Sequence, residues 1–338
     1  RAVEFFAPLP QPHRILWNDG PRLRAIDARL DAVGLSPREP GKGRNVWFCM
    51  GYALASGRSE SLAMHDCDIL TYDRSLLARL IYPVANPGFN YEFCKGFYAR
   101  VANGKINGRV SRLLVTPLLR ALKKVFGHLD YLDYLDSYRY PLAGEFSFRK
   151  DVINDLRIPS DWGLEIGVLS EMQRNYSNNR LCQVDIADAY DHKHQDLSVG
   201  NDATGLAKMS IDITKAIFRK LATCGVVFNQ ETFRSIKASY FRIALDFVET
   251  YRNDAQMNGL TLDVHAEVGN NACLGRRLGL SPSGTCGEAG LVMLGQLGGS
   301  AEVRCTVLAA YVARHYGRRV TLFSHPDRPI RSIAWCTG

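Results

Sequence analysis

The sequence predicts an α/β protein in which a layered, Rossmann-like sheet is followed by C-terminal helices. Residues 1–200 alternate short apolar segments with helical patterns, and two long amphipathic patterns follow between about 204 and 251. Of the 338 residues, 46% are hydrophobic and 22% are charged, which is typical of a chain that buries a full core. No apolar run approaches the roughly 20 residues of a membrane span, and the sequence has no basic-then-apolar leader pattern. We therefore expect a cytoplasmic protein with no membrane partner.

Individual elements follow from periodicity and from turn residues. The apolar segments at 14–18 and 61–65 predict strands, and the pattern at 46–55 between them predicts a helix. Pro117 near the start and Gly127 after the end of an apolar pattern predict a further helix. Amphipathic spacing predicts two packing helices, through 206–221 and 233–248.

By composition the chain divides into three regions. Residues 1–200 are expected to form the sheet domain, and residues 201–266 a helical extension. Residues 267–338 differ from both, because they contain eleven Gly, four of the nine Cys and no Lys. Only 303–316 shows helical periodicity there. Such a shift marks either a separate module or a stretch that is not native to the ancestral domain, and we favour the second interpretation.

The net charge of +8 is unevenly spread. Residues 267–338 carry eight Arg against three Glu and one Asp, whereas the rest of the chain is only mildly basic and has no Lys/Arg run with interleaved aromatics. This pattern favours a small anionic substrate over nucleic acid. The nine cysteines show neither CxxC pairs nor zinc-site spacing, so we expect reduced thiols.

A glycine-lysine-glycine turn is the first candidate for chemistry. Gly41, Lys42 and Gly43 stand directly before a helical pattern. Glycine permits a backbone to approach a phosphate closely, and both the helix N-terminus and the lysine favour negative charge. An ordinary surface turn with an incidental lysine is the alternative.

Asp66 and Asp68 are the second candidate, and they directly follow the strand-like 62–64. Alternate residues leaving a strand can bring two carboxylates to the same side. Two hard oxygen ligands suit Mg²⁺ or Mn²⁺ shared with a diphosphate. The alternative is a solvated acidic turn.

Two further stretches combine charged and small residues. Residues 140–145 and 161–167 each set a carboxylate, Glu145 or Glu165, beside glycines that would permit close approach of a sugar, and Trp162 offers it an apolar face. Residues 191–194 hold two imidazoles, which could complete a metal site or hold a phosphate. Ordinary loops with exposed acids are the alternative for 140–145 and 161–167, and a solvated polar turn explains 191–194 nearly as well.

Taken together, these motifs resemble the glucosyl-3-phosphoglycerate synthases and their mannosyl relatives, from about residue 10 to about residue 265. The motifs, in order, are Gly41-Lys42-Gly43, Asp66-Cys67-Asp68, Gly108-Arg109-Val110-Ser111, Pro141-Leu142-Ala143-Gly144-Glu145, Gly163-Leu164-Glu165-Ile166-Gly167 and His192. The resemblance implies a GT-A fold. It also implies a retaining transfer of glucose from a nucleotide-diphosphate sugar to the 2-hydroxyl of 3-phosphoglycerate. UDP-glucose is the favoured donor.

The resemblance also implies roles for particular residues. Asp68, with Asp66 and His192, would hold Mg²⁺ or Mn²⁺, and Glu165 would meet the sugar hydroxyls, so that Asp68 and Glu165 are the catalytic candidates. The donor-binding candidates are Gly41, Lys42, Gly43, Asp66, Gly144 and Glu145. The acceptor-binding candidates are Arg109, Ser111 and His194; relatives tend to carry Thr in place of Ser111, and can carry Asn in place of His194.

This sequence departs from the family pattern in two ways. Relatives begin with a strand and loop that hold the nucleotide base and ribose, and no such segment precedes Gly41. Relatives end with a helical region that shields the site or forms a dimer, which residues 267–338 do not resemble. We therefore expect a chain without part of the donor site and with an atypical tail.

Three interpretations stay open. The first is the transferase, with another sugar or acceptor as a variant and a homodimer as one option. The second is an inactive remnant that keeps the fold, and the third is a basic binding protein without catalysis.

Overall fold

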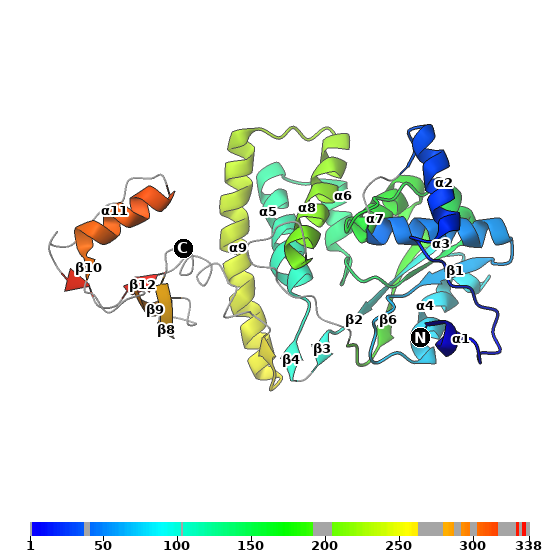
Figure 1. Cartoon of the computed structure of the whole chain (residues 1–338), viewed down its shortest axis with the longest axis horizontal. Helices are drawn as coiled ribbons and strands as arrows, with labels where there is room; N and C mark the ends of the chain where they lie inside the picture. The colour runs from blue at the N-terminus through cyan, green and yellow to red at the C-terminus, as the bar shows by residue number, and fades with distance from the viewer. Residues whose placement is uncertain are drawn as a thin grey trace. The chain divides into compact units, whose positions relative to one another are not determined.

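The computed structural model describes residues 2–36, 41–102, 104–191, 205–262, 280–286, 292–297, 303–316, 329–330 and 333–335 (Figure 1). The chain forms two compact units. One comprises Arg1–Asp196 with Ala203–Thr261, and the other comprises Leu197–Asp202 with Leu262–Gly338.

A four-stranded mixed sheet forms the centre of the first unit. Its strands lie in the order β1 (Ser61–Met64), β5 (Phe146–Arg149), β2 (Phe93–Tyr98) and β6 (Leu181–Ala187). Strand β5 is antiparallel to both β1 and β2, whereas β2 and β6 are parallel. The acidic motif therefore leaves the end of an edge strand.

Helices cover both faces of this sheet, because successive side chains of a strand point to opposite faces. Phe93 of β2 joins a large apolar cluster with helices α5 (Thr116–Phe126), α6 (Asp130–Asp136) and α7 (Leu164–Asn175). The next residue, Cys94, joins a second cluster with helix α4 (Arg74–Ala85). The first unit is thus a three-layer α/β structure.

Two long helices complete the first unit. Helix α8 (Gly205–Thr223) packs on α7, and helix α9 (Gln230–Met257) runs along α5, as Figure 1 shows. Helix α9 also fixes the π-helical segment Val110–Val115, because the Tyr240 hydroxyl donates a hydrogen bond to the Leu113 carbonyl at 2.9 Å. The remaining elements of this unit are α1 (Ala2–Phe6), α2 (Pro21–Ala32), α3 (Lys42–Ser56), β3 (Val101–Ala102), β4 (Lys105–Ile106) and the 3₁₀ helices Lys150–Asp155 and Asn178–Arg180.

The second unit has strands of its own. Strands β8 (Leu280–Cys286), β9 (Val292–Leu297) and β12 (Ile333–Trp335) form an antiparallel sheet in the order β12-β9-β8. Strand β10 (Val303–Arg304) pairs with β11 (Pro329–Ile330), and helix α11 (Cys305–Tyr316) follows β10. The short strand β7 (Thr261–Leu262) stands at the boundary between the units.

Most of the predicted elements are confirmed. The α/β class is confirmed, and the helices predicted at 46–55, after Thr116 and in the 206–248 region are α3, α5, α8 and α9. Gly127 ends α5 at φ 76°, a left-handed region that favours glycine. The sheet and the two long helices lie in the same compact unit.

The strand predicted at 14–18 is wrong. Residues 12–17 have no regular secondary structure, and Trp17 is 58% exposed. An isolated apolar run becomes a strand only when a neighbour satisfies its backbone groups. None of the described strands pairs with this segment.

In the part of the chain that the structure describes, no helix combines the length and hydrophobicity needed to cross a bilayer.

Candidate functional site

Lys42 lies between two carboxylates that are far apart in the sequence. Its Nζ atom is 2.7 Å from Asp66 Oδ1 and 2.7 Å from Glu165 Oε1. Lys42 begins α3, Asp66 follows β1 and Glu165 is in the first turn of α7. Burial lowers the pKa of Lys42, but Glu165 and Asp66 together outweigh it and the pKa is raised overall. Lys42 therefore stays charged.

Lys95 is a second lysine under the influence of the same carboxylates, Glu165 and Asp66. It lies in the middle of β2, is 1% exposed, and its Nζ donates a hydrogen bond to the Ala143 carbonyl. Burial is the largest influence on Lys95 and lowers its pKa to about 8, against the opposing attraction of Glu165 and Glu145. A lysine at this depth needs such partners, because an unpaired buried charge is very costly.

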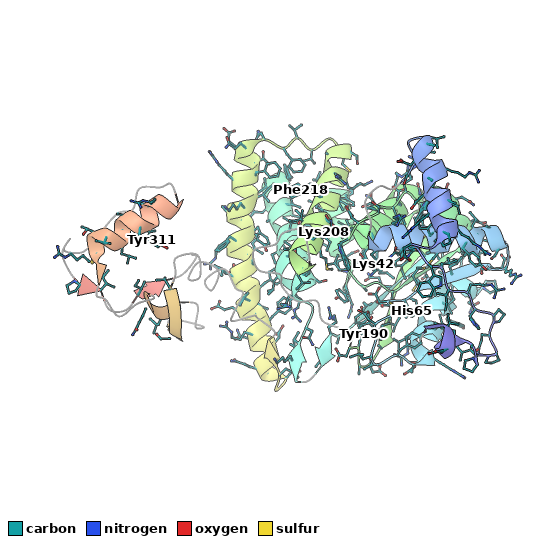
Figure 2. All side chains as sticks on the ribbon, in the orientation of Figure 1. Lys42, His65, Tyr190, Lys208, Phe218 and Tyr311 are labelled. Atoms are coloured by element: carbon teal, nitrogen blue, oxygen red, sulfur yellow. The ribbon has the colours of Figure 1, made fainter. Side chains whose placement is uncertain are left out.

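Glu145 is completely buried and accepts hydrogen bonds from two tyrosines. The Tyr98 hydroxyl donates to Glu145 Oε2 at 2.8 Å, and the Tyr190 hydroxyl donates to Oε1 at 2.7 Å. The two phenol rings stack with centroids 3.5 Å apart. Burial, followed by the repulsion of Asp66, raises the pKa of Glu145. Figure 2 shows Lys42, His65 and Tyr190, which mark this region of the first unit.

The acidic motif has hard oxygen donors for a cation. Asp66 and Asp68 are both partly exposed, and Gly144 leaves room beside Asp66, since a Cβ added there would lie 2.5 Å from both carboxylate oxygens. His65 is half-buried, neither of its two buried ring nitrogens has a hydrogen-bond partner among the described residues, and burial lowers the pKa of this imidazole.

These donors fit Mg²⁺ or Mn²⁺ in chemical type, since both ions prefer carboxylate oxygens. Within the described ranges, no group of three or more His, Cys, Asp or Glu residues is arranged to hold a metal. The third predicted ligand, His192, and the acceptor candidate His194 lie outside the described residues.

The glycines beside Lys42 make a close backbone contact with the loop before α7. A Cβ on Gly43 would lie 1.8 Å from the Pro159 carbonyl oxygen. The N–H groups of Gly43 and Arg44 donate to the carbonyls of Asp161 and Ser160 at 3.4 and 3.0 Å. The start of α3 is thus held by protein carbonyls, and the Lys42 side chain is the part of this motif that faces the acidic residues.

The predicted acceptor residues stand at the start of the π-helical segment. Gly108 has φ +93°, and a Cβ there would lie 3.5 Å from the Arg100 side chain, which donates to the Tyr140 hydroxyl at 3.1 Å. The Ser111 Oγ atom is buried and has no hydrogen-bond partner in the described part of the chain. Buried hydroxyls without a partner are rare in folded proteins.

Sequence reasoning missed several residues of this region. Lys95, Tyr98, Arg100 and Tyr190 were not predicted, although a lysine inside the otherwise apolar run of β2 was a usable signal. The tyrosines carried no such signal, because a buried tyrosine looks like core in any strand pattern.

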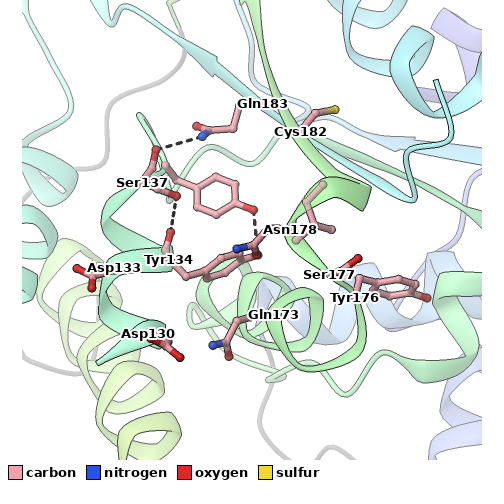
Figure 3. A pocket seen from close by; sticks show the side chains of 12 residues that line it. Asp130, Asp133, Tyr134, Ser137, Gln173, Tyr176, Ser177, Asn178, Cys182 and Gln183 are labelled. Carbon is pink, nitrogen blue, oxygen red and sulfur yellow. Dashed lines mark hydrogen bonds between the residues drawn. The ribbon is translucent and has the colours of Figure 1, made fainter. Parts of the chain in front are cut away.

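A pocket of about 700 Å³ lies elsewhere, between α6, the end of α7 and the start of β6 (Figure 3). Its lining includes Asp130, Tyr134, Gln173 and Gln183 but none of the predicted site residues. The Gln183 side chain crosses to the end of α6, where it donates to the Ser137 carbonyl at 3.1 Å. None of the residues that line this pocket belongs to the lysine-carboxylate site.

Fold and site together define an α/β protein with a mixed-charge site beside its sheet, built from two lysines and several carboxylates. The chain is 46% identical over 255 residues to a glucosyl-3-phosphoglycerate synthase of Persephonella marina, a match that covers 75% of this chain and 63% of that protein. It is 39% identical over 270 residues to the enzyme of the same name from Methanococcoides burtonii, covering 78% of this chain and 65% of that protein. The resemblance predicted from the motifs is confirmed.

The chain spans less than two thirds of the length of these two relatives. A solved structure of glucosyl-3-phosphoglycerate synthase from Mycobacterium tuberculosis, in complex with Mn²⁺, UDP-glucose and glycerol 3-phosphate, is 23% identical, with a TM-score of 0.43. That similarity covers 62% of this chain and 66% of the other. No protein-family model matches the chain.

A second kind of relative matches a shorter stretch. A GTP cyclohydrolase 1 type 2 homolog of Neisseria meningitidis is 37% identical over 89 residues, which are 26% of this chain and 35% of that protein. This match covers 26% of the chain and the match to the Persephonella enzyme covers 75%, so the two matched lengths together equal about the length of the chain.

Proposed function

We propose that the first unit is the core of a retaining glucosyltransferase that moves glucose from UDP-glucose to 3-phosphoglycerate. The observation that carries this proposal is the position of Lys42 between Asp66 and Glu165. Three motifs shared with the synthases thereby meet at one site, in a chain 46% identical to one of them.

The residues of the chain divide the work between donor and acceptor. Asp66 and Asp68 would hold Mg²⁺ or Mn²⁺, which when bound neutralises charge on the diphosphate leaving group. Lys42 would contact the donor phosphates, and Glu165 would accept hydrogen bonds from sugar hydroxyls. Arg109 grips the phosphate or carboxylate of the acceptor and so orients the attacking hydroxyl.

The cation site can be tested by replacing Asp68. Asp68→Ala removes a charged oxygen ligand, so we expect Mn²⁺ affinity in calorimetry to fall about tenfold or more, together with the affinity for UDP in the presence of Mn²⁺. Asp246→Ala is the control, since Asp246 is an exposed carboxylate of α9, paired with Arg242 at 3.0 Å. Equal affinities in both variants would remove Asp68 from the site.

Turnover separates the proposal from its alternatives. Release of UDP that requires both UDP-glucose and 3-phosphoglycerate supports the transferase, and the same assay with other sugars and acceptors defines its specificity. Metal binding without any turnover supports the inactive remnant. Nucleic-acid binding that survives removal of 267–338 supports the basic binding protein.

We also propose that the second unit is a separate module and corresponds to the stretch that matches the GTP cyclohydrolase 1 type 2 homolog. Its support is the compact unit that begins at Leu262 and the size of the second match. The cytoplasmic location and a homodimer remain predictions from the sequence.

A further inference from the structure

We propose that Glu145 is a positioning residue, which holds the loop carrying Asp66 and Asp68 in place for the cation. We name residues 65–71 the acidic loop and residues 188–191 the exit segment of β6. The proposal rests on the proposed function and assigns Glu145 a different task from the donor contact that the resemblance implies.

The carboxylate of Glu145 joins four separate parts of the chain. It stands directly before β5, and it accepts from Tyr98 of β2 and from Tyr190 of the exit segment at 2.8 and 2.7 Å. Its Oε1 atom also accepts the Asp66 N–H at 3.4 Å. Tyr190 and Asp66 therefore share one oxygen atom, and the acidic loop and the exit segment meet there.

Two further hydrogen bonds join the acidic loop to the exit segment directly. The Leu70 N–H donates to the Asp191 carbonyl at 2.8 Å, and the Asp191 N–H donates to Thr71 Oγ1 at 3.0 Å. The loop is thus attached to the exit segment at its far end and to Glu145 at Asp66. Asp191 immediately precedes His192 in the sequence, and His192 itself lies outside the described residues.

Burial argues against direct contact between Glu145 and a ligand. Glu145 is 0% exposed, and each carboxylate oxygen already accepts from a tyrosine. Burying a carboxylate is costly unless hydrogen bonds and nearby positive charge stabilise it. Here the two hydroxyls supply the hydrogen bonds, and Lys42 contributes attraction. A carboxylate that connects the acidic loop to the exit segment can do so without being accessible to a ligand.

The test compares tyrosine variants of the full chain that each lose one hydroxyl. Tyr190→Phe removes a donor to Oε1, the oxygen shared with Asp66, and Tyr98→Phe removes a donor to Oε2. Tyr138→Phe is the control, because the Tyr138 hydroxyl is also buried and donates to another tyrosine, Tyr134, at 2.9 Å.

Two measurements are made on each variant: amide hydrogen exchange of residues 65–71 without metal, and Mn²⁺ affinity by calorimetry. We expect Tyr190→Phe to accelerate exchange of the acidic loop and to weaken Mn²⁺ binding, each about fivefold, with Tyr98→Phe weaker and Tyr138→Phe without effect. Glu145→Gln keeps the size of the side chain and should exceed Tyr190→Phe in both measurements.

The outcomes separate this proposal from the proposed function. If the acidic loop exchanges at the same rate in Tyr190→Phe and Tyr138→Phe, the positioning role is overturned, whatever the Mn²⁺ affinity. Faster exchange with unchanged Mn²⁺ affinity also overturns it, because holding the loop would then have no effect on cation binding. Faster exchange in a chain whose wild type binds no Mn²⁺ supports the tie by Glu145 and overturns the cation site.

Discussion

The two compact units differ in what they bury. In the first unit, strands and helices from distant parts of the chain fill two apolar clusters on the two faces of one sheet, and the buried charged groups Lys95 and Glu145 lie beside them. In the second unit, Leu280 and Cys305 are the buried hydrophobic residues among those described. Among the described residues, those of the first unit therefore offer the low-dielectric surroundings in which charged groups acquire shifted pKa values.

The largest expected effect comes from Lys42, the centre of the charged site. Lys42→Gln leaves Asp66 and Glu165 facing each other without their shared cation, and it removes the ammonium proposed to contact the donor phosphates. We expect UDP affinity in the presence of Mn²⁺ to fall roughly 30-fold or more in calorimetry, as for the loss of one partner of a buried charge pair.

Lys123→Gln is a matched control for Lys42. Lys123 of α5 also lies between two carboxylates, which are Asp133 and Asp136 of α6, at 2.5 Å and 2.7 Å. A similar loss of UDP affinity in both variants would show that charge balance of the first unit matters, rather than this site.

A somewhat smaller effect is expected at the acceptor side. Arg109→Ala removes a charge-assisted hydrogen bond from the acceptor alone, so the KM for 3-phosphoglycerate should rise about tenfold while the KM for UDP-glucose changes little. Steady-state kinetics with each substrate varied in turn measures the difference. Arg174→Ala, at an exposed pair with Glu171, serves as control. Equal changes in both KM values would move Arg109 out of the acceptor site.

Sequence alone located the parts of this site that local patterns encode. Asp66 was found because it follows a strand, and Lys42 because glycines precede a helical pattern; the structure places both in the same site. The contact of Lys42 with Glu165 was not predicted, since no spacing rule joins α3 to α7. Tyr98 and Tyr190 were unpredictable for the same reason, because their partner Glu145 comes from another element.

In the second unit the local pattern predicted less. The periodicity of 303–316 indicated α11 correctly, but β8 and β9 run through glycine-containing segments that show no clear alternation. Register there depends on pairing between strands rather than on an apolar face. Sequence patterns are informative where one face of an element is buried, which is the condition that the first unit meets.

Lys95 should make stability depend on pH in a particular window. The pKa of Lys95 is about 8 in the folded chain, whereas an ordinary lysine side chain, as in the unfolded chain, has a pKa of 10.5. Between these two pH values the unfolded chain therefore binds more protons than the folded chain. The free energy of unfolding therefore rises with pH from about 8 to about 10, by roughly 1 to 3 kcal/mol from this group. Below pH 8 the cost of the buried charge is present in full.

The comparison of wild type with Lys95→Met isolates this effect. Denaturant unfolding at several pH values should show the wild type gaining stability relative to the variant as pH rises. Lys150→Met, at an exposed lysine paired with Glu60, should show no such trend in this window. A constant difference between wild type and Lys95→Met would mean that Lys95 titrates normally.

The smallest effect is expected from removal of the second unit. Deleting 267–338 should change the melting temperature of the first unit by no more than about 2 °C and leave Mn²⁺ affinity within about twofold, because the apolar clusters and the charged site are formed by residues before Thr261. A deletion from residue 247 is the control, since it also removes Tyr251, whose ring stacks under Arg112 at 5.2 Å, and the buried Ala255. That shorter chain should melt many degrees lower. If deleting 267–338 alone lowers the melting temperature by more than about 10 °C, the two units share a core, and the second cannot be a separate module.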